Sequence, residues 1–396
     1  MKKYLYESDI LIPKADFTKW SVIACDQYTS DKAYWDRVKQ NVGDEPSTLN
    51  LVLPEIFLEE SEDRINKINA TMQKYIEDGI FEVKPSSMIY VQRKFKNNKI
   101  RHGIVGMINL EDYDYKKGSS SLTRATEETV IERIPPRVEI RKDALIEFPH
   151  ILLFIDDPEN KVVGNVEKVS DTFELAYDFE LMENAGDIKG YYIDDENQTL
   201  INKNLDSLVK DGLLFAVGDG NHSLATAKEC HRINNSEMSK YALVEVVNIH
   251  DSSIEFEPIY RVLFGANKND VISAMKEFFT FANDKENAHS FDIYYGDKCE
   301  TVSVEAISKL PVGSLQTFLD KYLKENPQVK IDYIHGIEDT KKLCKNENTV
   351  GFIFDGMKKS ELFDAVVLDG SLPRKTFSMG TADEKRFYLE GRRIKW

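Results

Sequence analysis

A histidine that closely follows two glycines stands near the middle of the chain, where residues 217–223 read V-G-D-G-N-H-S. The apolar run Leu213–Val217 predicts a buried strand, and Leu224–Cys230 has the composition of a helix. A glycine turn between a strand and a helix exposes backbone N–H groups at the positive end of the helix dipole, so it binds anions. We therefore predict an anion site here, with His222 and Asp219 at the reacting group.

The same residues also fit an ordinary strand–helix turn. In that interpretation Asp219 or Asn221 caps the helix, because Asp and Asn are favoured N-cap residues. The glycines and the histidine favour the functional interpretation, since glycine lets a ligand approach the backbone closely. The residues predicted to bind the nucleotide phosphates here are Gly218, Gly220, Asn221 and Ser223.

Several carboxylates are candidates for a catalytic base or a Mg²⁺ ligand. Asp26 directly follows Trp20–Cys25, an apolar run that predicts a second buried strand, and loops that follow such strands often carry function. The polar cluster after this run also fits a simple helix cap at Ser30 or Asp31. The candidate carboxylates are Asp26, Glu127, Glu128 and Asp219.

A denser group of charges lies in residues 124–137, R-A-T-E-E-T-V-I-E-R-I-P-P-R. We predict a short helix over Thr126–Arg133 that Pro135 and Pro136 end. Arginines beside carboxylates suit the recognition of a zwitterionic or phosphorylated small molecule. The alternative is a solvated helix face with weak surface ion pairs. The predicted substrate-binding residues are Arg124, Glu127, Arg133 and Arg261.

The segment Leu372–Gly380, L-P-R-K-T-F-S-M-G, combines a cation, hydroxyls and a glycine. We predict that Lys375 meets phosphate there, although the segment lacks the spacing of a Walker A loop. A charged terminal helix is the alternative interpretation for the residues that follow, E-K-R-F-Y-L-E-G-R-R.

Familiar catalytic motifs are absent from the sequence. It contains no H-E-x-x-H, G-x-S-x-G, kinase H-R-D or G-x-G-x-x-G pattern. The histidines show no metal-ligand spacing, which makes a metal hydrolase the weaker interpretation. Phosphoryl transfer requires positioning, charge neutralisation and a base, and these residue types are all present.

The composition limits the function classes further. The chain has 396 residues, 41% of them hydrophobic, and a net charge of −16, which disfavours binding to nucleic acid. No apolar run approaches the length of a membrane span, and the four cysteines contain no C-x-x-C pair. We expect a cytoplasmic enzyme or binding protein.

The pattern of elements predicts an α/β fold with two domains, residues 1–264 and 265–396. The tail of the second domain is expected to return to the site. The main predicted elements are strands at Ile10–Pro13, Met88–Phe95, Ile100–Leu110 and Tyr241–Ile249, and helices at Asp31–Gln40, Glu55–Asp78 and Gln198–Lys210. After residue 265, helices near Val271–Phe281 and Leu315–Glu325 alternate with short strands.

Several motifs together resemble the domain-of-unknown-function family numbered 1015. They are V-G-D-G-N-H-S-L-A-T-A-K, G-I-V-G-M-I-N-L-E-D-Y-D-Y, R-A-T-E-E-T…E-R-I-P-P-R, E-F-E-P-I-Y-R-V and L-P-R-K-T-F-S-M-G, in this order. The D-G-N-H-x-x-x-x-A pattern is also similar to the phosphate-binding turn of the ParB/sulfiredoxin-like fold. The resemblance therefore implies a ParB/sulfiredoxin-like core beside the second α/β domain.

That superfamily includes ATP-dependent kinases of free L-serine, so the resemblance implies a phosphotransferase that makes O-phospho-L-serine. The turn from Gly218 to His222 matches the nucleotide-phosphate turn. Ser223 stands where the common pattern has arginine, and Tyr260 stands where relatives often have histidine. The glutamate base of the serine kinases has no secure counterpart here.

The resulting hypothesis is an ATP-dependent (or ADP-dependent), Mg²⁺-requiring kinase of free serine or a similar hydroxy amino acid. Two alternatives stay open: a nucleotide-binding regulatory module without transfer activity, and a phosphate-ester hydrolase. The expected partners are a nucleotide and a small substrate, with no nucleic acid or membrane. The metal ligands and the oligomeric state are left open, a homodimer being one option.

Overall fold

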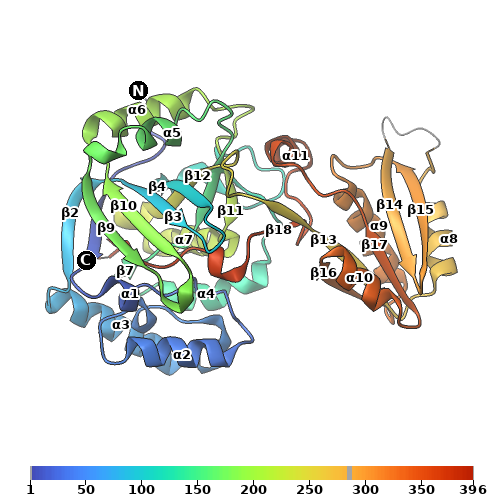
Figure 1. Ribbon diagram of the computed structural model, residues 1–396, viewed down its shortest axis with the longest axis horizontal. Helices are drawn as coiled ribbons and strands as arrows, with labels where there is room; N and C mark the ends of the chain where they lie inside the picture. The colour runs from blue at the N-terminus through green and yellow to red at the C-terminus, as the bar shows by residue number, and fades with distance from the viewer. Residues whose placement is uncertain (1, 283–287, 396) are drawn as a thin grey trace. The chain divides into compact units, whose positions relative to one another are not determined.

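The computed structural model describes residues 2–282 and 288–395, and the chain divides into two compact units. The first unit comprises Met1–Ala125, Thr129–Ile254 and Thr381–Trp396. The second comprises Thr126–Glu128 and Glu255–Gly380. Both units combine helices with sheets, which confirms the predicted α/β class (Figure 1).

A large mixed sheet forms the centre of the first unit. Within the described residues its strand order is β5-β6-β11-β8-β12-β4-β3-β10-β9. Strand β11 pairs in parallel with β6 and antiparallel with β8, whereas β12, β4, β3, β10 and β9 form antiparallel neighbours. The strands are β3 (Ile89–Lys94), β4 (Ile100–Asn109), β5 (Tyr113–Asp114), β6 (Thr123–Ala125), β8 (Leu152–Ile155), β9 (Glu174–Glu180), β10 (Asp187–Tyr192), β11 (Phe215–Asp219) and β12 (Tyr241–Asn248).

Smaller elements complete this unit. Its two-stranded sheets pair β1 (Ser8–Pro13) with β2 (Phe81–Ser87), and β7 (Ile146–Glu147) with β19 (Arg392–Arg393). Its α-helices are α1 (Phe17–Trp20), α2 (Lys32–Val42), α3 (Ser61–Glu77), α4 (Ile134–Arg141), α5 (Val163–Glu167), α6 (Asp195–Asp206) and α7 (Asn221–Asn234). Its 3₁₀ helices are η1 (Thr48–Asn50), η2 (Glu55–Glu60), η3 (Leu110–Asp112), η4 (Ile131–Arg133), η5 (Ser170–Thr172), η6 (Met182–Asn184), η7 (Met238–Lys240) and η9 (Ala382–Glu384).

The large sheet has an apolar core on each face, because successive side chains of a strand point to opposite sides. Ile89 and Val91 of β3 join the core that includes α2, α3 and β1, whereas Tyr90 between them joins the core that includes α5, α6 and α7. Figure 1 shows α2 and α3 on one side of the sheet and α5 and α6 on the other. The sheet is therefore covered on both faces.

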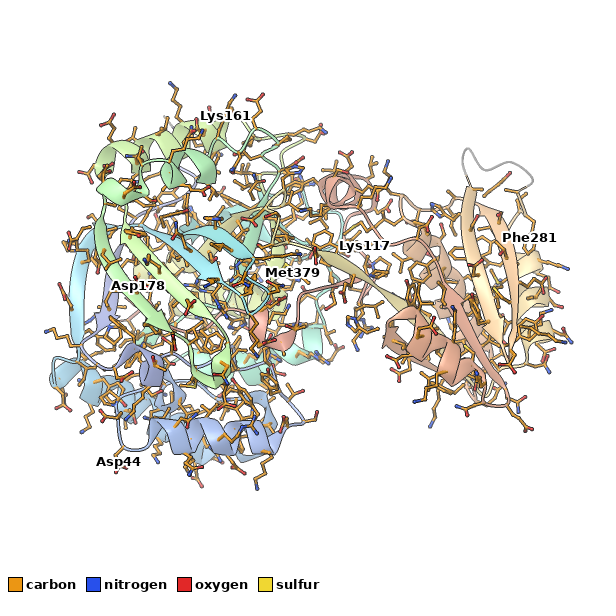
Figure 2. All side chains as sticks on the ribbon, in the orientation of Figure 1. Asp44, Lys117, Lys161, Asp178, Phe281 and Met379 are labelled. Carbon is orange, nitrogen blue, oxygen red and sulfur yellow. The ribbon has the colours of Figure 1, made fainter. Side chains whose placement is uncertain are left out.

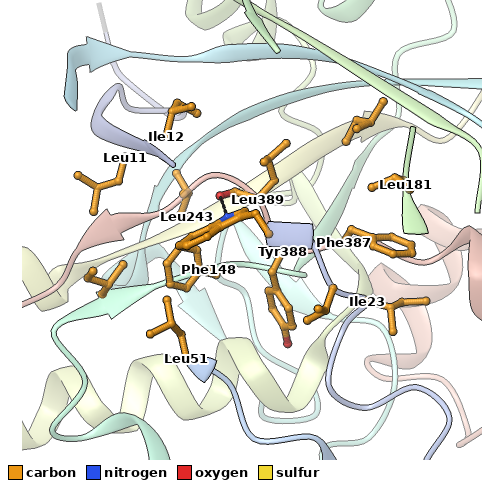
Figure 3. Close-up of a cluster of buried hydrophobic side chains, with 14 of the residues drawn as sticks. Leu11, Ile12, Ile23, Leu51, Phe148, Leu181, Leu243, Phe387, Tyr388 and Leu389 are labelled. Atoms are coloured by element: carbon orange, nitrogen blue, oxygen red, sulfur yellow. Dashed lines mark hydrogen bonds between the residues drawn. The ribbon is translucent and has the colours of Figure 1, made fainter. Parts of the chain in front are cut away.

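The C-terminal segment is part of the first of these cores. Figure 3 shows Phe387, Tyr388 and Leu389 among the buried side chains of this cluster, beside Phe148 and Leu243. The indole N–H of Trp20 donates to the Leu389 carbonyl oxygen at 3.1 Å. Residues from the two ends of the chain are thus packed together.

The second unit is built on an antiparallel sheet. Within the described residues its order is β15-β14-β17-β13-β16, with β18 also paired to β13. Met379 of β18, labelled in Figure 2, pairs with Phe256 of β13. The strands are β13 (Phe256–Phe264), β14 (Ala288–Tyr295), β15 (Lys298–Glu305), β16 (Lys330–His335), β17 (Thr349–Ile353) and β18 (Phe377–Met379). The helices are α8 (Lys268–Phe278), α9 (Pro311–Glu325), α10 (Ile337–Cys344), α11 (Leu362–Asp369) and the 3₁₀ turn η8 (Lys359–Glu361).

The predicted strand at Trp20–Cys25 is wrong. Asp16 caps a short helix, α1, by accepting a hydrogen bond from the Lys19 N–H, and the chain then continues with a single bridge from Ile23 to Phe387. The run is apolar because it is buried, and burial alone does not make a strand.

The predicted helix over Thr126–Arg133 is also wrong. Residues Thr123–Ala125 form β6, and helical structure begins only at η4. Pro135 and Pro136 occupy the first turn of α4 and so begin a helix where we expected them to end one. Proline is tolerated there because first-turn N–H groups have no acceptor within the helix.

The long helix predicted at Glu55–Asp78 is interrupted: a 3₁₀ turn, η2, precedes α3. The other predicted elements are confirmed with small shifts at their ends, including the hairpin of β3 and β4 and helices α2, α6, α8 and α9. In the described part of the chain no helix has both the length and the apolarity that a membrane span requires.

Candidate functional site

The predicted glycine turn joins β11 directly to α7. Gly220 is the N-cap residue and adopts φ +83°, in the left-handed region that glycine favours. A Cβ atom at this position would lie 3.1 Å from the Ile151 Cα atom, so the turn also lacks room for a side chain. No side chain caps α7, and capping by Asp219 or Asn221 is therefore wrong. The anion site predicted at the first turn of this helix stays a prediction.

Asp219 braces the turn from the end of β11. Its Oδ1 accepts the Gly220 N–H at 3.0 Å, and its Oδ2 lies 3.3 Å from the Lys385 Nζ. Both side chains are largely buried, with 21% and 16% of their surface exposed. A carboxylate and an ammonium group thus lie side by side at the start of α7.

His150, which immediately precedes the buried run of β8, links the turn to the C-terminal segment. Its Nε2 lies 2.9 Å from the Ser223 Oγ, and its Nδ1 lies 2.9 Å from the Tyr388 hydroxyl. That hydroxyl accepts the Cys25 N–H at 3.1 Å. Burial raises the pKa of Tyr388 well above its ordinary value, so the phenol keeps its proton.

The ring protons of His150 follow from the direction of these two hydrogen bonds. When the Tyr388 hydroxyl donates to Nδ1, the Nε2–H donates to the Ser223 hydroxyl; when Tyr388 donates to the side chain of Cys25, Nδ1–H donates to Tyr388 and Nε2 accepts from Ser223. In either tautomer His150 links the turn to the C-terminal segment.

Asp26 lies on the other side of His150. Its Oδ2 is 3.9 Å from the His150 Nε2, and its Oδ1 accepts from the Gln27 Nε2 at 3.0 Å. Burial by itself would raise the pKa of Asp26, but the charge of His150, the Gln27 amide and Lys385 outweigh burial and lower it. Asp26 is therefore a carboxylate at neutral pH.

His222, the histidine of the predicted anion site, is held by a hydrogen bond. Its Nε2 accepts the Val130 N–H at 3.3 Å, which joins α7 to the segment that precedes η4. An accepting Nε2 means that a neutral His222 carries its proton on Nδ1.

Two buried oxygens close to this contact lack partners within the described residues. They are the Asn221 Oδ1, at the first position of α7, and the Thr129 Oγ1, beside Val130. Buried polar atoms are almost always hydrogen-bonded, so these two oxygens are candidates for contact with a ligand or water.

The described residues contain no group of three His, Cys, Asp or Glu side chains that could hold a metal ion alone. Mg²⁺ in nucleotide sites needs no such group, because one or two protein oxygens suffice when phosphates and water supply the rest. Asp26 and Asn221 offer oxygens of the required type.

The remaining predicted residues come from β6, η4 and the segment between them. The Arg124 guanidinium is buried and donates to the carbonyl oxygens of Ser121 at 2.9 Å and Asp211 at 3.1 Å; burial lowers its pKa. The side chains of Glu128 and Arg133 are exposed. The Arg124 guanidinium therefore stabilises a loop, whereas the side chains of Glu128 and Arg133 are accessible to a ligand.

Glu128 and three further predicted residues belong to the second unit. Glu127 forms a parallel bridge with Leu372. Arg261 is fully buried and donates to the carbonyl oxygens of Lys375 at 2.9 Å and Arg374 at 3.0 Å and to the Gln316 Oε1 at 3.1 Å. The Lys375 side chain is exposed, with its Nζ 5.2 Å from the Tyr333 ring centroid.

No sequence pattern assigns His150, Lys385 or Tyr388 to the site. The available signals were a histidine directly before an apolar strand and a tail that mixes cations with aromatic residues. Neither signal identifies a partner, because the contacts join residues more than 70 positions apart.

Solved structures with a similar arrangement include a conserved hypothetical protein from Pyrococcus furiosus, at 14% identity and a TM-score of 0.39, covering 74% of this chain and 95% of that one. A mutant free serine kinase in complex with AMP has 14% identity and a TM-score of 0.43, with 74% and 92% covered. C-terminally truncated SbnI from Staphylococcus aureus has 12% identity and a TM-score of 0.36, with 70% and 82% covered.

No curated protein matches the sequence. The family model described as "Protein of unknown function (DUF1015)" matches residues 8–322, which confirms the resemblance seen in the motifs. The chain belongs to the DUF1015 family.

Proposed function

We propose that this protein is an ATP-dependent phosphotransferase that acts on free L-serine or a similar hydroxy amino acid. The observation that carries the proposal is the meeting of an ionised carboxylate, Asp26, with the start of α7 through His150 and Ser223. The site thus combines a proton acceptor with an anion-binding helix end, which are the parts that phosphoryl transfer requires.

Asp26 is the proposed base. The transition state of phosphoryl transfer is loose in most analyses, so the attacking hydroxyl keeps much of its proton until late, and a weakly basic carboxylate can accept it. Asp26 has the correct protonation state at neutral pH because its pKa is lowered. His150 lies beside the carboxylate, with its Nε2 3.9 Å from the Asp26 Oδ2.

The start of α7 is the proposed site of the nucleotide phosphates. Gly220 leaves the backbone accessible, and the helix dipole favours negative charge at this end. Asn221 places a buried, unpartnered oxygen at the same end. The site would take ATP, or ADP as the alternative donor.

Mg²⁺ would be held by oxygens of Asp26 or Asn221 together with the phosphates of the nucleotide. When bound, the ion would neutralise charge that develops on the transferring group. His222 and Asp219 would keep the turn in its bound geometry through their contacts with Val130 and Gly220.

The acceptor amino acid needs partners for its amino and carboxylate groups. Glu128 and Arg133 are exposed and stay candidates for binding the amino and carboxylate groups of the acceptor. For Glu127, Arg261 and Lys375 the predicted roles in binding stay predictions. Arg124 is less suited to this task, because its donors already serve two carbonyl oxygens.

Phosphorus NMR of the purified protein with ATP, Mg²⁺ and a mixture of hydroxy amino acids tests the proposal. The expected result is a phosphomonoester signal that grows as ADP appears, and repeats with single acceptors identify the substrate. ADP and free phosphate without an ester would support the hydrolase. Binding of intact ATP without turnover would support the regulatory module.

A further inference from the structure

Lys385 lies at the candidate site and no part of the sequence pattern assigns it a role. Its Nζ is 3.3 Å from the Asp219 Oδ2, and only 16% of its side-chain surface is exposed. It also helps to lower the pKa of Asp26 against the opposing effect of burial, after the larger contributions of His150 and Gln27. One ammonium group thus acts on the two carboxylates nearest the turn.

The backbone on both sides of Lys385 is held by buried charged groups. The carbonyl oxygen of Glu384 accepts from the Arg101 Nη1 at 3.1 Å, and that of Arg386 accepts the Ala24 N–H at 3.0 Å. The Arg386 guanidinium forms fully buried ion pairs with Glu245 and Glu390.

The Arg386 guanidinium also connects the segment around Lys385 to the site. Its Nε donates to the carbonyl oxygen of Pro149 at 3.1 Å, next to His150. The lysine is therefore presented from a fixed backbone, and holding it near a ligand costs little additional conformational entropy.

The pairing of Lys385 with Asp219 is a stable arrangement only while no stronger anion is present. The terminal phosphates of a nucleotide carry more negative charge than one carboxylate, and lysine is a common point-charge ligand of phosphate. The start of α7 attracts the same phosphates.

We propose that Lys385 binds the terminal phosphates of the nucleotide by exchanging its partner Asp219 for them. This inference rests on the proposed function, because it uses the same site. Lys385 lies beyond residues 8–322, the part that the family model matches. It supplies a cation beside a turn in which Ser223 provides only a hydroxyl.

Calorimetric titration of the full chain with adenosine, AMP, ADP and ATP, without Mg²⁺ at first, tests the inference. The variant is Lys385→Met, which keeps the length of the apolar stem but removes the charge. Lys395→Met is the matched control, since Lys395 is an exposed lysine of the same C-terminal segment that pairs with Asp143. Circular dichroism verifies that both variants are folded.

We expect Lys385→Met to weaken ATP binding about 10- to 100-fold, the range for a hydrogen bond to a charged group. The loss should shrink from ATP to ADP to AMP and vanish for adenosine, and the control should bind all four as the parent does. Equal losses for ATP and adenosine, unchanged ATP binding, or no ATP binding by the parent protein would overturn the inference.

A second variant gives an effect of opposite sign. Asp219→Asn retains the oxygen that accepts the Gly220 N–H but releases Lys385 from its ion pair. ATP binding without Mg²⁺ should therefore become severalfold tighter, and weaker binding would contradict the exchange.

These experiments separate the inference from the proposed function. Phosphate-dependent loss of affinity in Lys385→Met, together with no phosphoryl transfer by the parent protein, would retain the role of Lys385 and reject the kinase. Phosphoryl transfer to serine by the parent protein, together with unchanged ATP affinity in Lys385→Met, would retain the kinase and reject the role of Lys385.

Discussion

Two segments share one feature of sequence, a mixture of glycine with polar and charged residues. They are the turn Gly218–Ser223 in the first unit and the segment Leu372–Gly380 in the second. Their side chains are used differently. Asp219 pairs with Lys385, and Ser223 is hydrogen-bonded to His150. Each of these side chains can exchange its present partner for a ligand. In the second unit, the buried cation Arg261 donates to the backbone carbonyls of Arg374 and Lys375.

The difference shows how the contacts of a charged residue indicate its role. A guanidinium bonded to several backbone carbonyls holds a loop, and exchanging those partners for a ligand would leave the carbonyls without donors. A lysine paired with one carboxylate at a helix start can change partner at little cost. The first region is therefore the better candidate for chemistry, and the second for stability.

The largest expected effect concerns the proposed base. Asp26→Asn should lower the rate of phosphoryl transfer to serine about 10²- to 10⁴-fold, because no carboxylate then accepts the hydroxyl proton. The rate is measured by following ADP and phosphoserine formation. Asp36→Asn, an exposed aspartate of α2, is the control. An unchanged rate in Asp26→Asn would remove this residue from the site.

The next effect concerns the second region. Arg261→Met should lower the free energy of unfolding by about 2–3 kcal/mol, because buried carbonyl oxygens lose their donor. Urea denaturation measures this loss, and Arg374→Met, which changes an exposed side chain, is the control. We expect ATP affinity to be unchanged in Arg261→Met. Weaker binding of ATP or serine in a folded variant would instead support the predicted role of Arg261 in binding.

A smaller effect tests the geometry of the turn. Gly220→Ala should lower the free energy of unfolding by about 1–2 kcal/mol, because a side chain is strained at φ +83° and its methyl group would press on Ile151. Gly79→Ala is the matched control: Gly79 has φ +66° and no atom within 4 Å of its would-be Cβ. The difference between the two urea midpoints isolates the contact with Ile151, and equal losses would mean that the turn has room for a side chain.

The smallest effect is on the dependence of stability on pH. Because the folded pKa of Asp26 lies below its ordinary value of 3.8, the unfolded chain takes up this proton first as the pH falls. The stability that the carboxylate contributes is present above pH 4 and is lost as the pH falls through the folded pKa. Asp26→Asn should therefore lose less stability than the parent between pH 5 and pH 3, as measured by urea midpoints. Equal losses would show that Asp26 is not held in its ionised form.

Local patterns predicted much of the secondary structure. Apolar runs located β3, β4 and β12, and Asp31 caps α2 by accepting the Tyr34 N–H, as its position before a helix indicated. The same reasoning failed at Trp20–Cys25, where the apolar residues are buried by tertiary contacts such as the one between Trp20 and Leu389. A local pattern reports burial but does not identify what covers the segment.

By itself, the sequence determined the glycine turn between β11 and α7, because a glycine between a strand and a helix is a local feature that depends on adjacent residues. Only the tertiary structure decided which groups meet there. Asp26, His150 and Lys385 come from separate parts of the chain, and the distances between them and the lowered pKa of Asp26 arise from folding. Sequence spacing carries no information about such contacts, since each depends on how the C-terminal segment and the N-terminal loop pack around β8 and α7.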